Sequence, residues 1–194
     1  MTFNQLIFAG VDLSSGRKPV TFTALDRELS IVLRERWSFA ETISYLNEYE
    51  KILLAITSST KNSGATSFQK ELTDVGISAL SNHNERRQFV ETKAHDCYRM
   101  LAGSKLLSSR TFEGRIQRSL ILYEEGFQIP DPMDLFEEIT RHKLLQGVLP
   151  IEDLYSTKEL DALVAAYLAW MTANRPNQVE FTSENFAVPK APDG

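Results

Sequence analysis

A short apolar run near the N-terminus, Leu6 to Val11, places the strongest limit on how this chain can fold. The run is too short for an ordinary helix and rich in residues that favour strands, so it predicts a buried strand. Asp12 follows directly and is expected where that strand leaves the sheet. This carboxylate is the first candidate for a functional residue, although it could simply accept hydrogen bonds in the turn that follows.

The next segments predict a sheet that begins with a meander. Strands are expected over 6–13, 19–26 and 29–37, and their short connections indicate antiparallel pairing. Ser38 and Glu41 have capping-box spacing, which predicts a helix to about Tyr49. The continuous apolar run 51–56 predicts a fourth strand that is covered on both faces. The expected order is β-β-β-α-β.

Beyond the fourth strand the pattern is less regular, and we expect one domain over 1–194. The expected segments are an excursion over 57–84 with a short helix at 68–80, helices over 85–102 and 111–125, and an irregular tail over 189–194. Residues 135–140 are interpreted as a last strand, although with their neighbours up to Gly147 they could equally form a helix.

The clearest local prediction is a helix over 157–172. Ser156 and Glu159 have capping-box spacing, and apolar residues recur on one face. Asp161 lies beside that face, near the positive end of the helix dipole. If it meets Asp12, the two carboxylates form a divalent-metal site. The alternative is that Asp161 only complements the helix dipole.

Charge and composition limit the other functions. The net charge of -5 argues against broad electrostatic binding of nucleic acid, so any contact with phosphate is expected to be local. Cys97 is the single cysteine, and no run approaches the roughly 20 apolar residues of a membrane span. No signal peptide is recognised, so the expected location is the cytoplasm. The basic cluster is Lys105, Arg110, Arg115 and Arg118, which could bind phosphates or form a solvated helix face.

The order of these features resembles the RNase H-like superfamily, in its RuvC-type branch. It is most similar to an uncharacterised prokaryotic family of domain-of-unknown-function proteins that are predicted RNase H-like nucleases. The resemblance covers nearly the whole chain. The segments that carry it are Phe8–Asp12, Arg118–Gly126, Phe136–Ile139, Leu144–Gly147, Asp161–Ala166 and Phe186–Pro189.

The resemblance implies an α/β, RNase H-like fold with a mixed five-stranded sheet in the order 3-2-1-4-5 and helices on both faces. It also implies a hydrolase: a nuclease that uses two Mg²⁺ or Mn²⁺ ions held by carboxylates. One ion lowers the pKa of the attacking water and the other stabilises the leaving oxygen. On this mapping Asp12 bridges the ions and Asp161 completes the site, with nucleic acid as the substrate.

The chain departs from the family at the end of the fourth strand. Where the family has an Asp after the apolar run, this chain has Thr57, a neutral and weak ligand. Glu138, at the end of the expected last strand, corresponds to a family acid and could supply the missing charge. Asp96 also matches an acidic family position. The alternatives to an active nuclease are a degenerate relative, a non-catalytic module that binds nucleic acid or a protein through the same cleft, and a structural subunit whose loop 57–84 forms an interface.

Overall fold

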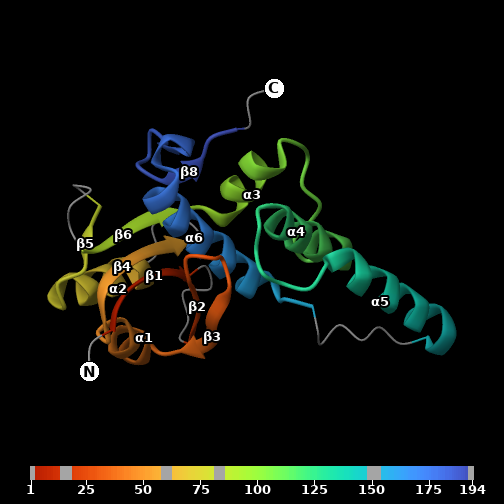
Figure 1. Cartoon of the computed structure of the whole chain (residues 1–194), viewed down its shortest axis with the longest axis horizontal. Helices are drawn as coiled ribbons and strands as arrows, with labels where there is room; N and C mark the ends of the chain where they lie inside the picture. Colours follow the sequence, from red (N-terminus) through yellow and green to blue (C-terminus); the bar gives the residue numbers. More distant parts are fainter. Residues whose placement is uncertain (1–2, 14–18, 58–62, 81–85, 148–153, 192–194) are drawn as a thin grey trace.

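The apolar N-terminal run forms the interior of a mixed sheet. The computed structural model describes residues 3–13, 19–57, 63–80, 86–147 and 154–191, and its main sheet has six strands in the order β3-β2-β1-β4-β6-β5 (Figure 1). The strands are β1 (Phe3–Asp12), β2 (Val20–Leu25), β3 (Ile31–Trp37), β4 (Tyr49–Thr57), β5 (Ser78–Ala79) and β6 (Arg87–Thr92). Strands β1 to β3 form the predicted antiparallel meander, and β4 and β6 extend the sheet in parallel. The α/β class and the order 3-2-1-4 are therefore confirmed.

The fifth strand comes from a different part of the chain than predicted. Residues 135–140 belong to a helix, α5 (Pro132–Gln146), so the strand prediction there is wrong and the sheet has six strands rather than five. The neighbour of β4 is β6, inside the segment 85–102 where a single helix was expected. Pro132 at the start of α5 favours a helix, and the spacing of Phe136 and Ile139 fits a helix as well as a strand.

The other helices follow local sequence signals closely. They are α1 (Phe39–Leu46), α2 (Ser63–Asp74), α3 (Ala94–Ala102), α4 (Phe112–Glu124) and α6 (Thr157–Asn174). Both predicted capping boxes form, at the starts of α1 and α6. The expected excursion contains α2, which begins earlier than the helix predicted within 68–80 but overlaps it, and β5. Residues 58–62 and 81–84 of the excursion lie outside the described residues. After α6, a short 3-10 helix (Pro176–Gln178) leads to the hairpin of β7 (Val179–Phe181) and β8 (Ala187–Pro189). Pro189, the first residue of the expected irregular tail, belongs to β8, and residues 192–194 of that tail lie outside the described residues.

Alternating residues of β1 face two separate apolar layers. Ile7, Ala9 and Val11 pack in a layer that includes side chains of α1 and α2. Phe8 packs on the other side, in the layer that contains α6. This alternation is expected for a strand with both faces covered. Because Asp12 is even-numbered like Phe8, its side chain belongs to the face that α6 covers.

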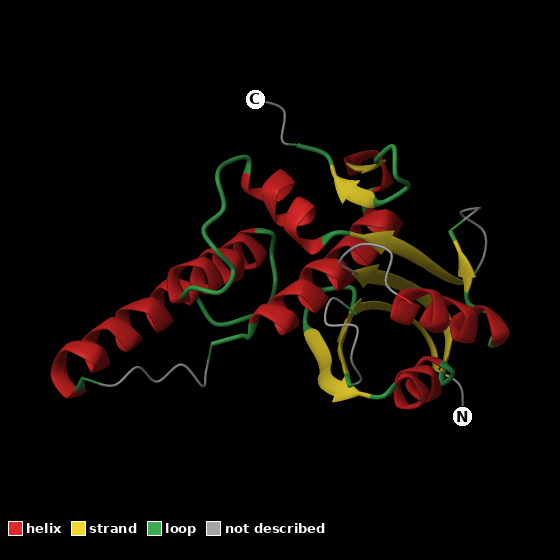
Figure 2. Cartoon of the chain, turned by 180° about the vertical axis from the view of Figure 1, so that it is seen from behind, coloured by secondary structure: helices red, strands yellow, loops and turns green. Residues whose placement is uncertain are grey.

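Helix α6 is buried on all sides rather than on one stripe. The residues from Ala162 to Ala169 are all 0% exposed. One side contacts β1, β2 and β4, and the other contacts α3, α4 and β8 (Figure 2). A Cβ atom on Gly10 would lie 2.0 Å from the carbonyl oxygen of Ala162. A glycine at position 10 therefore allows the backbones of β1 and α6 to touch.

Helix α5 has a different position from all of these elements. It packs against α4 at its start and then extends away from the sheet, as Figures 1 and 2 both show. Its last turns carry the most exposed large apolar side chains of the described residues, Leu144 and Leu145.

Candidate functional site

Asp12 lies in a row with a threonine on each neighbouring strand. It is the last residue of β1 and is 1% exposed. The strand register places Asp12 beside Thr21 of β2 and Thr57 of β4, and Thr57 beside Thr92 of β6. Paired residues of neighbouring strands point to the same face of a sheet, so all four side chains face α6. Thr21 and Thr92 were not predicted at this site, because strand pairing sets which residues lie beside Asp12 and Thr57.

Asp161 lies in the second turn of α6 and is close enough to Asp12 for the two charges to interact. The pKa of Asp161 is raised to about 7, mainly by burial and secondly by the charge of Asp12. The positive charge of the Arg118 guanidinium lowers this pKa. Gly10, two residues before Asp12, lies against the backbone of Ala162, the residue after Asp161. The structure thus brings the two carboxylates singled out in the sequence into one site.

Two buried side chains from α3 and α4 lie beside Asp161. Arg118 is 3% exposed, and its Nη1 donates to the carbonyl oxygens of Gly114 and Leu107 at 2.7 and 3.1 Å. Its guanidinium lies 5.4 Å from the centroid of the Tyr98 ring. The Tyr98 hydroxyl donates to the carbonyl oxygen of Leu160 at 2.7 Å, and burial followed by the charge of Asp161 raises its pKa well above the ordinary value. Arg118 therefore supplies a buried positive charge next to the carboxylate pair.

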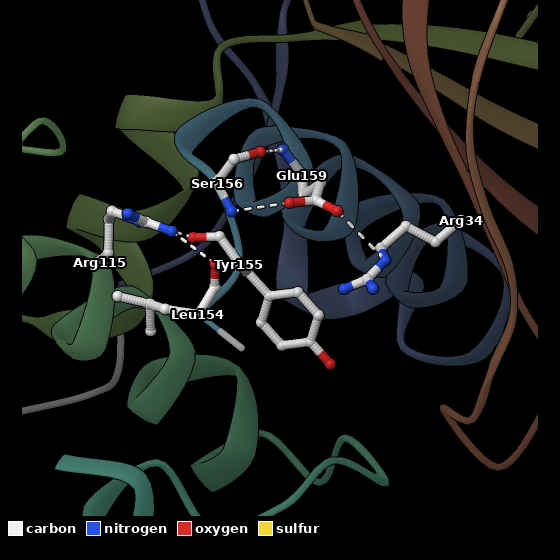
Figure 3. Close-up of polar contacts among 6 residues, drawn as sticks. All are labelled: Arg34, Arg115, Leu154, Tyr155, Ser156 and Glu159. Carbon is white, nitrogen blue, oxygen red and sulfur yellow. Dashed lines mark hydrogen bonds and ion pairs between the residues drawn. The ribbon is translucent and has the colours of Figure 1, made fainter. Parts of the chain in front are cut away.

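The start of α6 is held in place by two arginines from different elements. Figure 3 shows the residues involved, which are Arg34, Arg115, Leu154, Tyr155, Ser156 and Glu159. Arg115 donates to the carbonyl oxygens of Leu154 and Tyr155, just before the helix begins. Arg34 lies 3.2 Å from a carboxylate oxygen of Glu159 and 4.8 Å above the Tyr155 ring. These contacts fix the helix end that carries Asp161.

Thr57, the last residue of β4, is tied to the start of α3. Its hydroxyl accepts a hydrogen bond from the backbone N–H of Ala94 at 3.2 Å. The neighbouring Thr92 hydroxyl donates to the carbonyl oxygen of Ala187 at 2.8 Å and lies 3.0 Å from the Cys97 sulfur. Thr57 and Thr92 thus connect the sheet to α3 and to β8, and they add no charge to the site.

The two acids that were expected to replace the missing carboxylate lie elsewhere. Glu138 is exposed on α5, not at the end of a strand. Asp96 is half-buried on α3 and lies 3.5 Å from Arg99. Among the described residues, no group of three or more His, Cys, Asp or Glu side chains is placed to share a metal ion. Within that part of the chain, the acidic centre consists of Asp12 and Asp161.

The predicted basic cluster does not form one surface. Lys105 and Arg110 are exposed. Arg115 and Arg118 direct their donors to backbone carbonyls inside the protein, as described above. The helical spacing of these two arginines was correct, but their burial depends on tertiary contacts that the sequence pattern does not reveal.

Cys97 does not have the properties of a nucleophile. It is fully buried on α3 and is a free cysteine. Burial is the main cause that raises the pKa of its thiol to about 12, so the thiol stays protonated at neutral pH.

The ligand atoms of the site suit a hard divalent cation. Two carboxylates and the nearby threonine hydroxyls are oxygen donors of the kind that Mg²⁺ and Mn²⁺ prefer. Mg²⁺ commonly uses one or two protein carboxylates and completes its shell with water and substrate phosphate. Asp12 and Asp161 could therefore supply the two carboxylates that hold one such ion, whereas a second ion would need further anionic ligands beyond this pair.

No protein-family model matches the chain, and no curated protein matches it. In the described residues, no helix is long and apolar enough to cross a membrane.

Proposed function

We propose that this chain is an RNase H-like hydrolase that cleaves phosphodiester bonds with a divalent cation held by Asp12 and Asp161. One observation carries the proposal: two sheltered carboxylates, far apart in the sequence, approach closely enough for Asp12 to help raise the pKa of Asp161 to about 7. Two like charges that lie close together and are shielded from water destabilise the folded protein, and a bound cation would remove this destabilisation. The position at the carboxyl ends of parallel strands is also where α/β sheets place their sites.

The residues have distinct roles in this proposal. Asp12 and Asp161 would hold the ion, which when bound would act as a Lewis acid on a phosphate oxygen and lower the pKa of a water ligand. Arg118 favours the ionised form of Asp161, which is the form that binds a cation. Arg115 fixes the helix end that carries Asp161, so it acts through position and does not touch the substrate.

Calorimetry with Mn²⁺ tests the metal site directly. The wild type should bind the ion at millimolar concentration or below, and Asp12→Asn should abolish the heat, because half of the anionic ligand set is lost. Thr57→Asp should bind Mn²⁺ more tightly than the wild type, since a third carboxylate would join the face that already holds Asp12. If neither the wild type nor Thr57→Asp binds metal, the nuclease proposal is wrong.

A cleavage assay with single-stranded, duplex and hybrid substrates completes the test. Metal-dependent cleavage by the wild type, lost in Asp12→Asn, would support the full proposal. Cleavage that appears only in Thr57→Asp would identify the wild type as a degenerate nuclease. No cleavage by any variant that binds Mn²⁺ would contradict the hydrolase and leave only the metal site.

A second candidate is a module on the same fold that binds nucleic acid without cutting it. The observation in its favour is that Thr57, at the family's acidic position, instead accepts a hydrogen bond from the backbone of α3. The exposed Lys105 and Arg110 would then contact phosphates. Fluorescence anisotropy in EDTA should detect oligonucleotide binding that weakens in Lys105→Ala and Arg110→Ala. Binding that persists unchanged in both variants would contradict this alternative.

A further inference from the structure

The last turns of α5 carry two leucines that no described part of the chain covers. Leu144 is 81% exposed and Leu145 is 78% exposed, the highest values for large apolar side chains among the described residues. These turns extend away from the sheet (Figures 1 and 2). Neighbouring exposed leucines at the tip of a projecting helix indicate an interaction surface rather than a solvated face.

The first half of α5 is anchored to the rest of the protein. Phe136 stacks on Phe112 of α4, with ring centroids 5.8 Å apart, and Ile139 is 1% exposed. Beyond Ile139 the helix continues for about two turns. Short helical extensions gain little stability in water by themselves, so these turns would gain from a partner along their exposed face.

Charge divides the exposed face of α5 into two halves. The first half carries the exposed acids Asp134, Glu137 and Glu138, whereas residues 140–146 contain no acid and include the exposed Arg141. Glu137 and Arg141 lie 2.8 Å apart, and both side chains are at least 70% exposed. Met133, which is 48% exposed, adds an apolar residue at the acidic end to match the two leucines at the other end. The surface is therefore complementary to itself when one copy is reversed.

We propose that α5 pairs with α5 of a second copy of this chain, antiparallel about a two-fold axis beside residue 139. In this arrangement Met133 lies opposite Leu144 of the partner subunit at one edge of the contact, and Glu137 lies opposite Arg141 of the partner subunit. The axis repeats each contact, as in any symmetric dimer. A parallel pair would instead place the acidic halves against each other, which is why the antiparallel pair is favoured.

The size of the surface sets the strength of this association. A helix of 15 residues is about 22 Å long, so the pair would bury less than the roughly 800 Å² per partner of a standard interface. The dimer is therefore expected to be weak and to depend on protein concentration. This inference does not depend on the metal site or on the proposed hydrolase activity.

Sedimentation equilibrium of the full chain tests the proposal. The wild type should shift from the 22.0 kDa monomer toward twice that mass as the concentration rises. The rise is expected between about 10 µM and 500 µM, as suits a small interface. Glu137→Arg and Arg141→Glu should each keep the chain monomeric, because like charges would face each other twice. The double variant Glu137→Arg/Arg141→Glu should recover the dimer, because the charges are only exchanged.

Matched variants distinguish this specific contact from non-specific association. Leu144→Glu should abolish the dimer, whereas Leu107→Glu, at an apolar side chain that is 49% exposed outside α5, should not. Glu124→Arg on α4 makes the same charge change as Glu137→Arg at another exposed position and should leave the dimer intact. Circular dichroism should show that every variant is folded. A wild type that stays monomeric throughout, or a folded charge-exchanged variant that fails to recover the dimer, would overturn the proposal.

Discussion

The charge of Asp161 should make the stability of the protein depend on pH in an unusual direction. A carboxyl group normally titrates at 3.8 in the unfolded chain, and in the folded protein burial and Asp12 raise the pKa of Asp161 to about 7. Between these values the folded state holds a proton that the unfolded state has released, so the free energy of unfolding falls as pH rises. This loss of stability is absent below pH 4 and reaches its full size above pH 7.

The magnitude follows from the size of the shift. Three pKa units at about 1.4 kcal/mol each set an upper limit of about 4 kcal/mol, and relaxation of the site would bring it closer to about 1 kcal/mol. Asp161→Asn removes the charge and keeps the side-chain size. In EDTA at pH 8 it should therefore be more stable than the wild type by about 1 to 4 kcal/mol, and at pH 4 the difference should nearly vanish.

Urea unfolding at pH 4, 5, 6, 7 and 8 measures this dependence. Asp74→Asn, at an exposed position of α2, is the matched control and should stay parallel to the wild type. Millimolar Mn²⁺ at pH 8 should stabilise the wild type and leave Asp161→Asn unchanged, because binding to the folded state alone raises stability. The reasoning is refuted if the wild type and Asp161→Asn differ by the same amount at every pH. A variant less stable at pH 8 would instead show that Asp161 mainly complements the helix dipole.

Further substitutions test the contact between β1 and α6 and the hydrogen bonds that Arg118 donates. Gly10→Ala would place a Cβ atom 2.0 Å from the Ala162 carbonyl oxygen, so it should cost about 3 kcal/mol or more in urea unfolding. Gly76→Ala meets no atom within 4 Å and should cost only the roughly 1 kcal/mol of its positive φ; equal losses would contradict the close-contact argument. Arg118→Met should cost about 2 to 4 kcal/mol, because two backbone carbonyls lose their donor. A loss below about 1 kcal/mol would show that water replaces the guanidinium.

Sequence signals predicted the parts of the fold that depend on near neighbours. The meander, β4 and the two capping boxes each come from a short stretch with its own pattern, and the structure has them all. The strand β6 was missed because its six residues are too few to outweigh the helical pattern around them. The segment 135–140 was misassigned because its apolar spacing suits a strand and a helix equally.

The same division applies to the site. Asp12 and Asp161 were singled out because each lies near the end of an element with a clear local pattern. Arg118 and Tyr98 were given other roles or none, since their closeness to Asp161 depends on how α3 and α4 pack on α6. Glu138 was assigned to the site on the basis of a strand that does not exist. Side chains brought together by packing leave no periodic signal in the sequence.

The central position of α6 has a consequence for how the chain is made. The face of β1 that α6 covers is synthesised about 145 residues before the helix begins. At ribosomal rates of about 5 to 20 residues per second, the apolar face of β1 stays uncovered for roughly 7 to 30 s, until synthesis of α6 begins. Contacts this distant in sequence also slow folding after synthesis. Variants that weaken α6 should therefore lower the yield of folded chain in cells, through aggregation or chaperone capture of the uncovered sheet.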